Sequence, residues 1–296
     1  MKNANGSGLL TNMRRFVLSL AGIYVALQCA TSAVASPLER LFVRKPEPLT
    51  FFTPQTSSPG KAPATVDHRA WQSWLDRYLV ANHPSGIHRV RYAAVDGPGK
   101  ALLGSYLQSL QAIDPRRLPR DEQLAYWINL YNAATVQVIV NHPGVKSIRE
   151  IKSGLFSIGP WKLPLVHVAG QTLSLDDIEH RIVRPLFHDR RVHFALNCAS
   201  LGCPDLAAMA YQGATLDAAL SAAQLAYLSH SRAIRFTPEG LTVSSLFNWY
   251  REDFASDEAG MVKYLAAHAP ARLATRLQSF RGTVRYDYDW NLNSAP

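Results

Sequence analysis

Apolar residues recur at helical spacing along most of the chain, and the clearest stretch runs from Pro119 to Val140. Side chains three or four positions apart lie on the same face of a helix. Two adjoining faces of this stretch are apolar, formed by Leu124, Ile128, Tyr131 and Thr135 and by Trp127, Leu130, Ala134 and Val138. A helix that is apolar over so much of its circumference is typical of the centre of a domain. We therefore expect helix 119–140 to be central.

Shorter helices and a few strands are predicted around this helix. Helical spacing or capping signals occur at 67–78, 100–113, 174–186, 215–229, 246–254, 258–268 and 270–280. Extended or alternating patterns, which are typical of strands, occur at 88–92, 193–197, 234–236, 241–243 and 284–290. Helices outnumber strands and do not alternate with them regularly. The pattern predicts an α+β fold, mostly helical, with a small, largely antiparallel sheet around one core.

The N-terminus has the features of a secretory signal. Lys2, Arg14 and Arg15 precede the apolar run Phe16–Leu27, and a small-residue cleavage pattern ends at Ala35. The run is shorter than the ~18 residues expected of a spanning helix. We expect residues 1–35 to be a signal peptide cleaved after Ala35, which predicts an exported, periplasmic protein with no transmembrane span in the mature chain. Retention of the signal as an anchor is the less favoured alternative.

The remaining chain is expected to form a Pro/Ser/Thr-rich arm, 36–65, and a single globular domain, 66–296. Removing the signal takes away three basic residues and no acidic one, so the net charge falls from +9 to +6. These charges are scattered, without the Lys/Arg cluster typical of nucleic-acid binding. We expect an unknown envelope component or a small-molecule or peptide substrate as the partner, no nucleic acid, and no cofactor.

The segment His193–Pro204 carries the most informative chemistry, because it contains Cys198 and Cys203 together with His193 and Asn197. A cysteine thiolate acts as a nucleophile when a base or a positive neighbour lowers the thiol pKa. Alternation along a strand at 193–197 points His193 away from Cys198. His180, oriented by Glu179, is therefore the better candidate for a catalytic base.

Amide side chains complete the predicted site. Asn129 and Asn132 share a face of the central helix and would supply donors to a developing oxyanion. We expect them to line a substrate pocket together with Asn197 and Trp127. This constellation predicts a thiol-dependent hydrolase or acyltransferase that acts on envelope material, with Cys198 or Cys203 as the nucleophile.

The two cysteines also allow other interpretations. An oxidising compartment favours a Cys198–Cys203 disulfide, which would contribute about 2 kcal/mol by closing a short loop. The protein would then be a non-catalytic periplasmic binding or structural domain. A redox-active pair departs from the usual Cys-x-x-Cys spacing. A metal site built from His193 and both cysteines lacks a fourth ligand, so no metal is predicted. The residues leave the hydrolase and the bridged domain open.

Several ordered motifs resemble the domain-of-unknown-function family 547. They are Tyr126-Trp127-Ile128-Asn129-Leu130-Tyr131-Asn132-Ala133, Ser174-Leu175-Asp176-Asp177-Ile178-Glu179-His180, the segment His193–Pro204, Phe247-Asn248-Trp249-Tyr250 with Asp253-Phe254, and Tyr288-Asp289-Trp290-Asn291-Leu292-Asn293. The resemblance covers about 101–293. The family pattern includes Asn197, Cys198, Cys203 and Pro204, but the family has no settled activity, so the resemblance implies positions rather than a reaction.

Overall fold

The computed structural model describes residues 47–54, 65–152, 154 and 158–296. The predicted signal peptide and most of the predicted arm lie outside these residues. No helix within the described ranges has the length and apolar character needed to cross a membrane.

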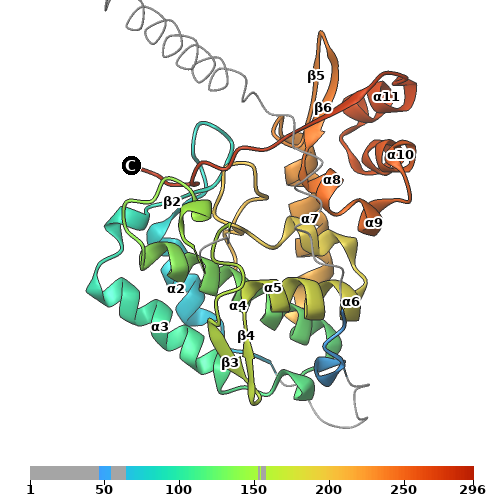
Figure 1. The fold of residues 1–296 in the computed structure, drawn as a ribbon. Helices are drawn as coiled ribbons and strands as arrows, with labels where there is room; N and C mark the ends of the chain where they lie inside the picture. Colours follow the sequence, from blue (N-terminus) through green and yellow to red (C-terminus); the bar gives the residue numbers. More distant parts are fainter. Residues whose placement is uncertain (1–46, 55–64, 153, 155–157) are drawn as a thin grey trace, which may run out of the picture.

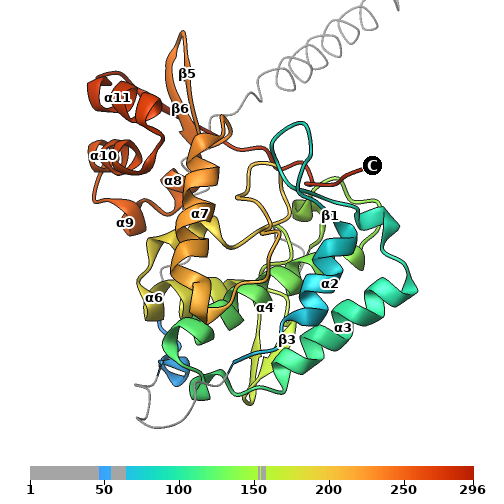
Figure 2. The same cartoon turned by 180° about the vertical axis from the view of Figure 1, so that it is seen from behind.

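Helices make up most of the structure, and the strands are short (Figures 1 and 2). The helices are α2 (Arg69–Tyr78), α3 (Gly97–Gln111), α4 (Arg120–Val140), α5 (Leu175–Asp177), α6 (Arg184–Phe187), α7 (Leu216–Ser229), α8 (Leu246–Trp249), α9 (Arg251–Phe254), α10 (Glu258–His268) and α11 (Ala271–Ser279). A π-helical segment, η6 (Ile178–Val183), joins α5 to α6, and η7 (Arg190–Phe194) is a 3₁₀-helix. The strands are β1 (Leu79–Val80), β2 (Arg89–Val90), β3 (Val166–Val168), β4 (Gln171–Leu173), β5 (Ile234–Thr237), β6 (Gly240–Ser244) and β7 (Val284–Asp287).

The strands are divided among three small sheets. β1 pairs with β2, and β3 pairs with β4, both antiparallel. β5 and β6 lie at the strands predicted for 234–236 and 241–243 and pair as an antiparallel hairpin, and β7 adds to β6 in parallel with Leu241 opposite Val284. The predicted α+β class with mostly antiparallel pairing is therefore confirmed, although the strands do not gather in one sheet.

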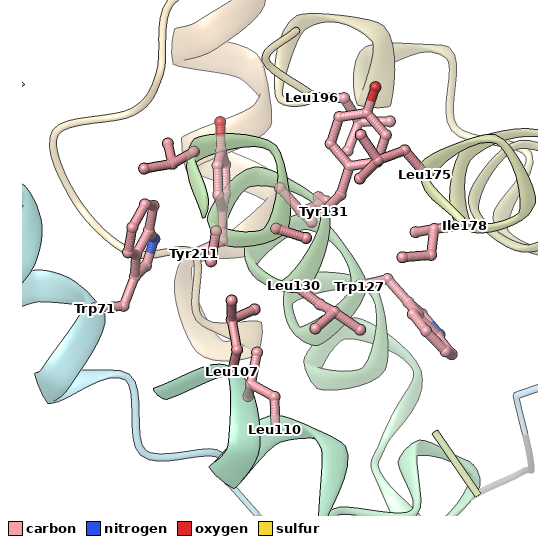
Figure 3. Packing of buried hydrophobic residues seen from close by; sticks show 14 of the residues in the cluster. Trp71, Leu107, Leu110, Trp127, Leu130, Tyr131, Leu175, Ile178, Leu196 and Tyr211 are labelled. Carbon is pink, nitrogen blue, oxygen red and sulfur yellow. The ribbon is translucent and has the colours of Figure 1, made fainter. Parts of the chain in front are cut away.

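α4 is the central helix, as its sequence pattern predicts. Nearly all of its residues are buried, and Glu122 and Gln123 in its first turn are buried with them. α2 and α3 lie on one side of α4, and α5 with η6 lies on the other (Figure 1). Figure 3 shows the packing: Leu107 and Leu110 of α3 approach α4 from one side, and Leu175 and Ile178 approach it from the other.

A second hydrophobic cluster lies beside the first and gathers the C-terminal part of the chain. It is formed by α7 to α11 with the β5–β6–β7 sheet, which stand together in Figure 1. Phe194, at the end of η7, belongs to this second cluster, whereas Val192 and Ala195 belong to the first. The segment that begins at η7 therefore contacts both clusters. Cys198 and Cys203 follow in this segment.

This position explains why the strand predicted at 193–197 is wrong. Apolar residues point both ways because the segment contacts two clusters, and η7 satisfies that pattern as a 3₁₀-helix. The Asp189 side chain caps η7 by accepting a hydrogen bond from the Arg191 backbone N–H. The helix predicted at 246–254 is also interrupted, because Tyr250 leaves helical geometry between α8 and α9.

Part of the predicted arm is attached to the domain. Thr50–Phe52 forms a single 3₁₀ turn, and Phe52 is fully buried. Its ring meets Trp127 edge-on with 5.0 Å between centroids. The backbone carbonyl of Phe52 also accepts a hydrogen bond from the Gln123 side chain. The turn therefore covers one end of α4.

Candidate active site

A tight turn presents Cys198 at the boundary between the two clusters. We call residues 198–203 the cysteine turn. The Asn197 side chain closes it, because its Oδ1 accepts from the Ala199 N–H at 2.9 Å and its Nδ2 donates to the Pro204 carbonyl at 2.7 Å. Ala199 adopts a left-handed conformation with φ 60°, which costs a non-glycine residue about 1–2 kcal/mol. The strained turn leaves Cys198 half-buried while its neighbours are buried.

Hydrogen-bond donors surround the Cys198 sulfur. The hydroxyls of Ser200 and Tyr288 lie 3.1 and 3.2 Å from Sγ. Burial alone would raise the pKa of Cys198, but hydrogen bonds from Cys203, Ser200 and Tyr288 outweigh it and lower the pKa from its ordinary 9.0 to about 7. Burial and the adjacent thiolate raise the pKa of Tyr288 well above its ordinary value, so its hydroxyl keeps its proton and donates. The site therefore holds a substantial fraction of thiolate at neutral pH.

Cys203 lies behind Cys198 and is 4% exposed. Its Sγ accepts a hydrogen bond from the Cys198 backbone N–H at 2.9 Å. Burial and the neighbouring Cys198 raise the pKa of Cys203 well above its ordinary value, so it remains a thiol. Both cysteines are free in the structure, without the disulfide that one interpretation of the sequence expects.

A largely buried network of charged and aromatic side chains adjoins the cysteine turn. We call Glu179, Arg184, His193, Tyr250 and Asp253 the polar network. Asp253 accepts from the Arg184 Nε and pairs with the His193 Nε2, each at 2.6 Å. Burial alone would raise the Asp253 pKa, but the bonds from His193 and Arg184 hold it well below its ordinary value. The His193 ring stacks on Tyr250 at 4.2 Å between centroids.

Glu179 is the carboxylate of this network that faces the tyrosines. Its Oε2 accepts from the Tyr131 hydroxyl at 3.1 Å, and the Tyr250 hydroxyl also hydrogen-bonds to it. Burial would raise the Glu179 pKa, but His180, His193, the Tyr250 hydroxyl and Arg184 together lower it.

The largest influences that lower the Glu179 pKa are His180 and His193, followed by the Tyr250 hydroxyl and Arg184. Burial in turn lowers the pKa of His180. A negative Cys198 raises the pKa of both Tyr131 and Tyr250, so the network lies within electrostatic reach of the thiol.

The predicted pairing of a histidine with a cysteine is not found. Among the described residues, no histidine hydrogen-bonds to either sulfur; His180 Nδ1 instead accepts from Arg184 Nη1 at 2.9 Å, and His193 pairs with Asp253. Glu179 orients tyrosines rather than His180. The thiolate of Cys198 is therefore stabilised by hydroxyl and thiol donors, whereas His180 pairs with Arg184 and His193 pairs with Asp253.

The amides predicted to bind substrate have structural partners instead. Asn132 donates to the Ala195 carbonyl at 2.9 Å and accepts from the Asn197 N–H at 2.8 Å. Asn129 makes the same kind of pair with the Tyr211 backbone, at 2.8 and 3.0 Å. Both are buried, and Trp127 is fully buried in the core. The amide groups of Asn129 and Asn132 are therefore paired with the protein backbone, and these two side chains support the core and the cysteine turn.

Residues 115–228 match the model of a protein family described as "Protein of unknown function, DUF547". Over this segment, the chain is similar to the DUF547 family. The match is narrower than the expected 101–293. No curated protein and no solved structure matches the chain. The DUF547 segment supplies the cysteine turn and Glu179, whereas Tyr250, Asp253 and Tyr288 come from the chain that follows it.

The sequence patterns alone did not identify Ser200, Tyr250, Asp253 and Tyr288 as site residues. Tyr250, Asp253 and Tyr288 lie in the motifs that carry the family resemblance, so a signal was present. The spacing of the aromatic residues around Tyr250 and Tyr288, however, is equally typical of core packing and of a strand. Only the fold brings the C-terminal segment back to the cysteine turn, where the Leu201 and Gly202 N–H groups donate to the Asn291 and Asp289 carbonyls.

No group of His, Cys, Asp and Glu within the described ranges could hold a metal ion. A cavity of about 350 Å³ lies between η7, α7 and α10, where Arg190, Gln224 and Tyr264 line it. No predicted site residue lines that cavity. The cysteine turn is singled out by its chemistry.

Proposed function

We propose that this protein is a thiol-dependent hydrolase or acyltransferase with Cys198 as its nucleophile. The observation that carries the proposal is the half-buried Cys198 sulfur, which lies 3.1 and 3.2 Å from the Ser200 and Tyr288 hydroxyls. Those donors, together with Cys203, lower the Cys198 pKa to about 7. Thiolates of this kind react with carbonyl carbons without an adjacent histidine base.

The proposed reaction has two steps. The Cys198 thiolate attacks a carbonyl carbon, a C–S bond forms, and the negative charge passes to the carbonyl oxygen. The Ser200 and Tyr288 hydroxyls that stabilised the thiolate are the nearest donors to this oxyanion. The bond to the leaving group then breaks, and the leaving group takes a proton from solvent. Water or an acceptor nucleophile cleaves the thioester and regenerates the Cys198 thiol.

The polar network would act as positioning machinery in this reaction. Glu179 fixes the hydroxyls of Tyr131 and Tyr250, and the ion pair of Arg184 with Asp253 fixes the His193 ring against Tyr250. A negative charge on Cys198 interacts electrostatically with both tyrosines. A change in the positions of these tyrosines would therefore change the stability of the thiolate. These residues are not proposed to touch the substrate.

An activated ester such as p-nitrophenyl acetate tests the nucleophile directly. The chain contains three cysteines, so we would use a Cys29→Ser background, with the unmodified chain as the matched control. Intact mass after rapid quenching should show one acetyl group, mapped to Cys198, and Cys198→Ser should lose that adduct while keeping the circular dichroism of the parent. An acetyl group on another residue, or no adduct in the parent, would refute the proposal and favour the non-catalytic binding domain.

The substrate is proposed to be envelope material, because the N-terminal features predict export to the periplasm. Cell fractionation and the N-terminal mass of the purified protein test this part separately. We expect the protein outside the cytoplasm with Ser36 as its first residue. A cytoplasmic protein that retains residues 1–35 would remove the envelope from the proposal without affecting the chemistry of Cys198.

A further inference from the structure

The two thiols of the cysteine turn are held together by the backbone around them. The Cys198 N–H donates to the Cys203 Sγ at 2.9 Å, and the Cys203 N–H donates to the Ser200 carbonyl at 3.2 Å. Asn197 bonds to both ends of the turn, at Ala199 and Pro204. The turn is therefore closed before any covalent bond joins the sulfurs, and little conformational entropy would be lost on bridging them.

The two sulfurs differ in exposure and in protonation. Cys198 is half-buried, whereas Cys203 is 4% exposed and lies behind it. The Cys203 side chain hydrogen-bonds to Cys198 and helps to lower the Cys198 pKa to about 7, while the Cys203 pKa is raised. A thiolate on a half-buried residue, backed by a buried thiol, suits thiol–disulfide exchange, in which one sulfur attacks the substrate and the other resolves the intermediate.

We propose that Cys198 and Cys203 form a redox-active dithiol that reduces disulfide substrates by thiol–disulfide exchange. The Cys198 thiolate attacks one sulfur of the substrate disulfide, so that a mixed disulfide forms and the other substrate sulfur leaves as a thiolate. Cys203 then attacks the Cys198 Sγ and releases the second substrate sulfur, while the Cys203 proton passes to a departing thiolate. The substrate gains two electrons, and the protein dithiol is oxidised to a Cys198–Cys203 disulfide. A small-molecule thiol would return the protein to its dithiol form.

This activity rests on the Cys198 nucleophile of the proposed function but not on acyl transfer. Cys203 separates the two reactions, because it is the resolving thiol in exchange and only a hydrogen-bond donor in acylation. The usual objection, the Cys-x4-Cys spacing, is answered by the fold: the turn brings the Cys203 sulfur back to the backbone N–H of Cys198.

Oxidised glutathione is the test probe, used with the full chain in the Cys29→Ser background. The parent should lose two hydrogens in intact mass, and proteolytic fragments should show a Cys198–Cys203 link within one chain. Cys203→Ser and Cys203→Ala should stop at one glutathione on Cys198, with an adduct that outlasts the parent's by about tenfold or more. Cys198→Ser should take up no glutathione at Cys203, because that thiol is buried. Circular dichroism and thermal unfolding of each variant identify any that fail to fold.

The outcomes separate this proposal from the previous one. A parent that keeps a stable glutathione adduct, or a Cys203 variant whose adduct decays as fast as the parent's, would overturn the dithiol activity. If p-nitrophenyl acetate still labels Cys198 in that case, the acyl-transfer proposal stands alone. If glutathione exchange proceeds but no acyl adduct forms, the dithiol activity stands and the acyl-transfer proposal fails.

Discussion

Replacing Tyr288 with Phe should raise the pKa of the Cys198 thiol. The substitution removes one hydroxyl, 3.2 Å from the sulfur, and keeps the ring that packs against Trp249 and Trp290. A hydrogen bond to a charged group contributes about 1.5–3 kcal/mol, and one pKa unit corresponds to about 1.4 kcal/mol. The thiolate pKa should therefore rise from about 7 by about one to two units.

The alkylation rate at one pH is a weaker measure than the titration midpoint. At pH 7, a rise of one to two units lowers the thiolate fraction about 5- to 50-fold, but a more basic thiolate is intrinsically more nucleophilic, with a Brønsted coefficient of about 0.4–0.5. The two effects leave a net slowing of only about 2- to 8-fold. The midpoint of the pH–rate profile keeps the whole shift and is the quantity to compare.

Iodoacetamide alkylation followed by peptide mass mapping, from pH 5 to pH 10, would measure this midpoint for Cys198 alone. Tyr264→Phe is the matched control, because it also removes a largely buried tyrosine hydroxyl, one that accepts from Gln224 and not from the cysteine turn. We expect the control to keep the parent midpoint. A Tyr288→Phe midpoint equal to that of the control would refute the argument that hydroxyl donors sustain the thiolate.

Three further substitutions test the supports of the site. Asn132→Ala should lower the free energy of unfolding by about 2–4 kcal/mol in urea denaturation, since it leaves two buried backbone groups unpaired; a loss below about 1 kcal/mol would contradict this role. Asp253→Asn should cost about 3–5 kcal/mol at pH 7, because Arg184 keeps a buried charge without its partner. Since the Asp253 pKa is lowered on folding, the parent should lose this contribution as the pH falls below about 4, whereas the variant should not; equal acid sensitivity of the two would argue against it. Phe52→Ala should cost about 3–5 kcal/mol by opening a cavity beside Trp127, and an unchanged melting temperature would show that the turn does not anchor the chain.

Local sequence determined the helices, because their signals lie within a few residues. The helix predicted at 174–186 begins with a capping box, in which the Ser174 hydroxyl accepts from the Asp177 N–H and the Asp177 carboxylate accepts from the Ser174 N–H. The apolar circumference of residues 119–140 identified the central helix, and the hairpin of β5 and β6 follows from its alternation and turn. Each of these depends on spacing along one segment, which the sequence displays directly.

The π-helix η6 and the 3₁₀-helix η7 were not predicted, because tertiary contacts determine their geometry. Residues 193–197 alternate like a strand because they contact two hydrophobic clusters, whereas the chain there follows the 3₁₀-helix η7. Residues 178–183 begin at a normal capping box but widen to π geometry, which carries Glu179 and His180 into the core. Neither outcome is visible in the local pattern.

The candidate site also has a part that the sequence reveals and a part that only tertiary structure determines. The sequence by itself located the chemistry in 193–204 and named Cys198 and Cys203, because reactive residue types are visible without a fold. Spacing along the sequence did not identify the residues that contact these cysteines, because contacts depend on proximity in the fold. Tertiary structure paired His193 with Asp253 and placed the Tyr288 hydroxyl 3.2 Å from the sulfur. The residues that set the thiol pKa come from distant parts of the chain, and only packing of the C-terminal segment against the cysteine turn brings them together.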